Sequence, residues 1–88
     1  MSEQNDALTS ATIRLEDKVA DGSGHHKIFV KGIEDQSDID RLARILSGKP
    51  GVIAVKVFVT GEVQFDTEFH VEAPVFENAV AQSGLELA

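Results

Sequence analysis

The chain of 88 residues is long enough for one domain with a small core, and its composition excludes several kinds of site. It has no cysteine, which removes disulfides, thiolate metal ligands and cysteine nucleophiles. Its formal net charge of −7 repels nucleic acid and anionic membranes at long range. Residues 1–6 are acidic where a signal peptide would be basic, and the longest mostly apolar stretch, 52–59, is too short to span a bilayer. We therefore expect a soluble cytoplasmic protein that binds neither nucleic acid nor membranes.

Residues 1–26 are mostly polar, and they predict a flexible acidic tail ahead of a domain at 27–88. Within the tail, residues 11–15 alternate weakly, as in a short strand or a single helical turn. Residues 21–24 have the composition of a flexible linker. The apolar residues through which the tail could contact the domain are Ile13, Leu15 and Val19.

Alternating apolar residues predict the first strand of the domain at 27–31, followed by a loop at 32–38. A helix over 39–46 comes next, because its apolar residues recur with the spacing i, i+3, i+4, i+7. Either Ser37 or Asp38 is expected to cap this helix by accepting a hydrogen bond from a free backbone N–H. The predicted core residues of the helix are Ile39, Leu42, Ala43 and Leu46.

The second half of the chain predicts two strands, a helix and a last strand. Gly48 ends the first helix, and strands at 52–59 and 62–66 flank a tight turn. Pro74 suits the first turn of a second helix, and a short strand at 85–87 closes the domain. The predicted core positions of the second helix are Phe76, Ala79, Val80 and Ser83.

The predicted order is β-α-β-β-α-β, the α+β, ferredoxin-like sandwich in which two helices cover one face of a four-stranded antiparallel sheet. Strand alternation then predicts which side chains occupy the other, open face. They are Lys27, Phe29, Lys31, Lys56, Phe58 and Gln64. Large apolar rings on an open face mark an interface. We therefore interpret this face as the contact surface for a protein partner or a second copy, formed by Phe29, Phe58, Lys27, Lys31 and Lys56. The alternative is that the tail residues Ile13, Leu15 and Val19 cover it.

RNA binding by the open face and catalysis by the chain have less support. Aromatic side chains flanked by cations on a sheet are typical of single-stranded RNA binding, but the net charge is acidic and no RNP-type motif is present. The sequence also has no nucleophile elbow, P-loop or dinucleotide motif. We predict a non-enzymatic interaction module.

Several motifs together point to a family. Residues 32–38 read Gly-Ile-Glu-Asp-Gln-Ser-Asp, and Pro-Gly-Val follows the first helix at 50–52. Further motifs are Val55-x-Val57, Val63-x-Phe65-Asp66 and Ala79-Val80-x-x-Ser83-Gly84. With these motifs, residues 27–87 resemble the heavy-metal-associated domain of copper chaperones and metal-transporting ATPases. The resemblance implies a ferredoxin-like fold. It places the family's two metal-binding cysteines at Asp35 and Asp38, so we do not expect Cu(I) binding, because Cu(I) prefers thiolates.

Metal binding through other ligands is the alternative function, and beyond such a divalent metal no cofactor is expected. Glu34, Asp35 and Asp38 place three carboxylates before the first helix, which suits Ca²⁺ or Mg²⁺. The simpler interpretation is that these carboxylates cap the helix and interact with its positive end. The two adjacent histidines could also bind Zn²⁺, Ni²⁺ or Cu²⁺ weakly, and a site of all three histidines is conceivable, but solvated, unrelated histidines are the simpler interpretation. The histidines are His25, His26 and His70.

Overall fold

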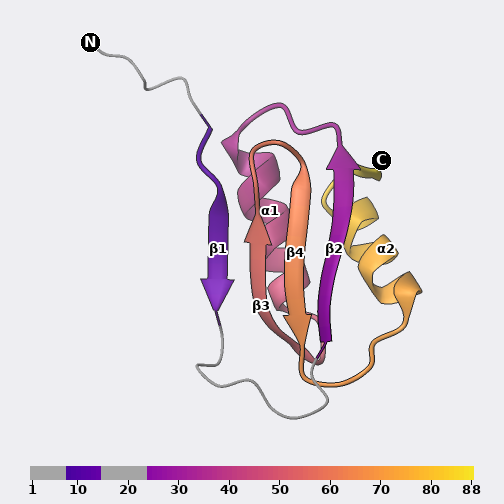
Figure 1. Cartoon of the computed structure of the whole chain (residues 1–88). Helices are drawn as coiled ribbons and strands as arrows, with labels where there is room; N and C mark the ends of the chain where they lie inside the picture. Colours follow the sequence, from indigo (N-terminus) through magenta and orange to yellow (C-terminus); the bar gives the residue numbers. More distant parts are fainter. Residues whose placement is uncertain (1–7, 15–23) are drawn as a thin grey trace.

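The computed structural model describes residues 8–14 and 24–88, which form a sheet with two helices behind it (Figure 1). The elements in chain order are β1 (Ala11–Arg14), β2 (Gly24–Lys31), α1 (Gln36–Ser47), β3 (Val52–Val57), β4 (Glu62–Thr67), α2 (Ala73–Gln82) and β5 (Glu86–Leu87). The sheet is antiparallel throughout, with strand order β1-β3-β4-β2-β5. The predicted α+β class is confirmed. In the described part of the chain, neither helix is long and apolar enough to cross a membrane.

The sheet has five strands, so the prediction of four was wrong. The additional strand, β1, lies in the segment predicted as a tail and pairs with β3, with Ala11 opposite Val57. Half-buried Ile13 packs against the core, and the pairing covers what would otherwise be a free edge of β3. The other two predicted tail contacts, Leu15 and Val19, lie outside the described residues.

The remaining strands have the order β3-β4-β2-β5, which is compatible with a ferredoxin-like layout. Within it β2 begins at Gly24, three residues before the predicted start, because Gly24 to Lys27 continue the pairing with β4. β3 ends at Val57, two residues earlier than predicted. Val59 therefore lies in the turn and is exposed.

The core fills the space between the sheet and the two helices. All four predicted core residues of α1 are buried. The predicted core residues of α2 are buried too, and so is Ser83, which is the C-cap of that helix. The largest side chains that meet these helices from the sheet are Val55, Val57, Val63 and Phe65. Since the inward side chains of each strand are committed to this core, the alternate side chains must lie on the open face.

The turn between β3 and β4 fixes how the strands align. Gly61 has a φ of 100°, a conformation that favours glycine. Its carbonyl accepts a hydrogen bond from Val30 N at 2.9 Å, and a Cβ at this position would lie only 2.5 Å from Val30 O. Phe58 N donates to Glu62 O at 2.8 Å, which places Phe58 opposite Glu62. The close approach of this turn to β2 thereby brings Phe58 and the end of β2 to the same end of the sheet.

Candidate interface on the open sheet face

The side chains of the open face form three rows that cross the strands, as the pairing registers show. The lysine row, at the centre, consists of Thr12, Lys56, Gln64 and Lys27. The phenylalanine row, towards the β3–β4 turn, consists of Phe58, Glu62 and Phe29. The histidine row, on the other side of the lysine row, consists of Ala54, Asp66 and His25, and the register continues it to position Arg14 on β1. All six side chains that the sequence predicted for the open face lie on it.

Phe29 is the most exposed large apolar side chain of the chain that the structure describes, with 52% of its surface accessible. Phe58 is half-buried, and Lys56 Nζ lies 5.6 Å from the centroid of its ring, within cation–π range. Glu62 lies between the two rings, and its Oε2 accepts a hydrogen bond from Gln64 Nε2 at 2.5 Å. The phenylalanine row therefore offers one free ring and one ring that is already covered by a cation.

The described charges of the open face cancel. Three lysines stand against three carboxylates, and one pair is in contact, since Lys31 Nζ lies 3.7 Å from Glu86 Oε1. The sequence predicted the lysines but missed the acids. Glu62 and Asp66 belong to the open face because they alternate with buried Val63 and Phe65 on β4. That alternation was visible in the sequence. The described side chains of the face thus carry no net charge, whereas the chain as a whole carries −7.

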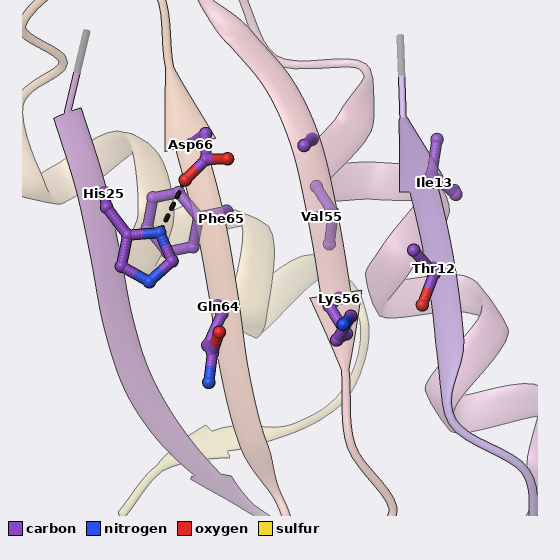
Figure 2. A pocket seen from close by; sticks show the side chains of 9 residues that line it. Thr12, Ile13, His25, Val55, Lys56, Gln64, Phe65 and Asp66 are labelled. Atoms are coloured by element: carbon purple, nitrogen blue, oxygen red, sulfur yellow. Dashed lines mark hydrogen bonds and ion pairs between the residues drawn. The ribbon is translucent and has the colours of Figure 1, made fainter. Parts of the chain in front are cut away.

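A shallow depression of about 220 Å³ lies over the lysine and histidine rows, where the small side chain of Ala54 leaves room. At its side His25 and Asp66 point toward each other across β2 and β4, with Nδ1 and Oδ1 2.5 Å apart (Figure 2). The hydroxyl in the lining is that of Thr12, which is on β1 and separated from β2 by two strands. Two intervening strands mean a separation of about 14 Å, so the lining does not bring this hydroxyl to His25 as a nucleophile would require.

The three histidines do not meet. His25 is on the open face, whereas the ring of His26 is on the helix face, where it stacks on Phe65 at 5.0 Å between centroids. His70 lies in the loop after β4, with Nε2 3.0 Å from Glu72 Oε2. Adjacent strand residues point to opposite faces, which separates His25 from His26 whatever the loop does. In residues 8–14 and 24–88, no three His, Cys, Asp or Glu side chains are grouped so that they could hold a metal ion.

The carboxylates of the 32–38 loop form a capping box at the start of α1. The N-cap is Asp35, whose Oδ1 accepts from Asp38 N at 3.2 Å. In return, Asp38 Oδ2 accepts from Glu34 N at 2.9 Å and from Asp35 N at 3.3 Å. The prediction of Ser37 or Asp38 as the cap was therefore wrong, because the helix begins at Gln36 and Asp38 is already its third residue. Glu34 contributes its backbone to the box.

These hydrogen bonds stabilise the charged form of Asp38. The backbone N–H of Glu34 is the main cause that lowers the pKa of the Asp38 carboxyl from its usual 3.8, helped by the N–H of Asp35 and by Arg41. Arg41 Nη1 lies 3.3 Å from Asp38 Oδ1 and also donates to Ser83 O at 3.0 Å. The side chain therefore links the start of α1 to the end of α2, a structural role.

In comparisons with protein-family models, with curated proteins and with solved structures, nothing matches this chain. The likeness to heavy-metal-associated domains thus rests on the motif spacing alone and stays a prediction.

Proposed function

We propose that this protein is a non-enzymatic interaction module that contacts other proteins through the open face of its sheet. The observation that carries the proposal is the exposure of Phe29 on this face. About half of the ring is in water. Covering the exposed part is worth about 1 kcal/mol, given that fully burying a Phe side chain contributes roughly 1.5–3 kcal/mol.

The surroundings of Phe29 suit a protein surface better than a nucleic acid. Glu62 is its neighbour on β4 and Asp66 lies two rows away, so carboxylates stand among the lysines. A phosphate backbone needs an excess of cations, and the described face has none. A protein surface with side chains of both signs meets no net repulsion there.

We also propose that β2 to β5 form a ferredoxin-like unit of the heavy-metal-associated kind, to which β1 adds an edge strand. The β-α-β-β-α-β order and the sheet order of this part support the assignment. At the positions of the family's cysteines, Asp35 and Asp38 direct their oxygens to backbone N–H groups. The module would then act without the thiolate metal site of the family.

The test is capture from a lysate with three immobilised baits. These are the wild type, Phe29→Ser, and Phe69→Ser as a matched control, because Phe69 is 50% exposed but lies beyond the end of β4. We expect at least one protein, either a different protein or a further copy of this chain, to bind to the wild type and to Phe69→Ser but not to Phe29→Ser. Identical retention by all three folded baits would contradict the proposal.

A further inference from the structure

We propose that the open face binds a second copy of this chain, and that the two copies pack face to face about a two-fold axis. The axis crosses the strands between the lysine row and the phenylalanine row. This inference rests on the proposed function of the open face, and it names the occupant.

Charge is distributed unevenly over the described surface. Outside the open face, the described residues carry seven carboxylates against three basic side chains. The carboxylates are those of Glu34, Asp35, Asp38, Asp40, Glu68, Glu72 and Glu77, and the basic side chains are Arg41, Arg44 and Lys49. Two copies therefore repel each other through these surfaces. The open face, where lysines and carboxylates balance, is the described surface on which two copies meet without net repulsion.

The lysine row and the phenylalanine row are complementary between two copies. A two-fold axis in the interface, perpendicular to the strands and midway between the two rows, exchanges them. On β2 it places Lys27 opposite Phe29 of the second copy, and the same holds for Lys56 and Phe58 on β3. Each such pair brings an ammonium group to an aromatic ring.

On the central strand β4, the same axis places Gln64 opposite Glu62 of the second copy. Within one copy these two side chains already form a hydrogen bond, so their chemistry is compatible. The two lysines of the row thereby lie opposite aromatic rings of the second copy, and Gln64 lies opposite a carboxylate that can accept its hydrogen bond.

The other in-plane axis, parallel to the strands along β4, gives the opposite result. It exchanges β3 with β2 and so places Lys56 opposite Lys27 of the second copy. It also places Glu62 opposite Glu62. Like charges in direct opposition disfavour an interface, so the register selects the axis that crosses the strands.

The distances suit this arrangement. Successive side chains on one face of a strand are about 6.7 Å apart, so each row lies about 3.4 Å from the axis, and stacked sheets are about 10 Å apart. A lysine side chain reaches across part of that gap, as Lys56 already does toward Phe58 within one copy. The packing angle of about 30° that sheet twist imposes preserves these contacts near the axis.

The area indicates a weak dimer. The strands β1 to β5 contain 4, 8, 6, 6 and 2 residues, which at about 3.4 Å per residue and about 4.8 Å between strands give a footprint of roughly 400 Å² per copy. Stable interfaces bury about 800 Å² on each side. We therefore expect a dimer that forms in a concentration-dependent way, with Phe29 as its anchor.

The first experiment is sedimentation equilibrium of the full chain from about 10 µM to about 1 mM, a range that covers weak association. We expect the wild type and Phe69→Ser to reach the mass of a dimer. Phe29→Ser should dimerise at least about tenfold more weakly. Lys27→Glu, a second variant at an exposed position, should weaken the dimer as well. A wild type that stays a monomer throughout, or a dimer unaffected by Phe29→Ser, would overturn the inference.

The second experiment tests the axis, and the absence of native cysteine makes it clean. Glu62→Cys and Gln64→Cys chains are mixed in equal amounts and joined with a short bismaleimide, because facing sheets about 10 Å apart are too distant for a disulfide. Unbiased pairing gives twice as much mixed product as either symmetric one. Because the axis places residue 62 opposite residue 64, we expect the mixed product to exceed that ratio several-fold. A twofold ratio or less would overturn the proposed geometry. If the chain is monomeric but a different protein is captured in a Phe29-dependent way, the inference fails while the proposed function stands.

Discussion

Replacing the N-cap of α1 tests what the loop carboxylates do. In the structure, Asp35 Oδ1 accepts from Asp38 N, and the Ser37 hydroxyl donates to the same oxygen at 2.6 Å. Asp35→Ala removes both bonds and leaves the Asp38 N–H without its side-chain acceptor. Loss of an N-cap typically costs about 1 kcal/mol, within roughly 0.5–2 kcal/mol. For a domain of this size, that cost lowers Tm by about 4–8 °C.

Thermal unfolding followed by circular dichroism measures the effect, with Asp35→Asn as the matched control. The asparagine side chain keeps an oxygen that caps nearly as well, so we expect Tm within about 2 °C of the wild type. An equal loss of stability in both variants would show that the charge, not the cap, matters. The same scans with Ca²⁺ or Mg²⁺ test the alternative function. A bound ion would raise Tm of the wild type but not of Asp35→Ala, and that result would refute the assignment of these carboxylates to capping.

Three further predictions follow from the same geometry. Because Asp38 has a lowered pKa, the stability it contributes is fully present above the usual value of 3.8 and is lost as the pH falls through its pKa in the folded chain. Urea unfolding from pH 7 to pH 2.5 should therefore show a steeper acid loss in the wild type than in Asp38→Asn. Gly61→Ala should destabilise the fold by more than about 1 kcal/mol, because the added methyl would lie 2.5 Å from Val30 O in a backbone conformation that favours glycine. Unchanged urea unfolding of this variant would contradict the turn geometry. In competition with a bicinchoninate-type chelator, the chain should leave Cu(I) on the chelator, because no thiolate is available, and a surviving 1:1 complex would contradict that reasoning.

The sequence predicted those features that depend on local periodicity. The spacing of Ile39, Leu42 and Leu46 determines one face of a helix, and all three are buried. Alternation along 27–31 likewise placed Phe29 on the open face, because a strand has a period of two. These signals are repeated several times within a few residues, so one unusual residue does not hide them.

Features that depend on distant pairing were not predictable in the same way. The strand at 11–14 pairs with β3, which is about forty residues further along the chain. Four weakly alternating residues are too few to predict that pairing. The cap was ambiguous because Asp35, Ser37 and Asp38 all have suitable side chains within one turn. The rows of the open face required the register, which the Gly61 turn and its approach to Val30 set.

The most direct test of the central claim is NMR mapping of the surface that is covered on binding. Spectra of the labelled chain are compared when free and when bound, either at high concentration or with a protein that Phe29-dependent capture supplies. We expect the largest changes on the Ala54 methyl, the Phe29 ring and the Gln64 side-chain amide, all on the open face. Changes gathered on the outer surfaces of α1 and α2, with those three groups unaffected, would contradict it.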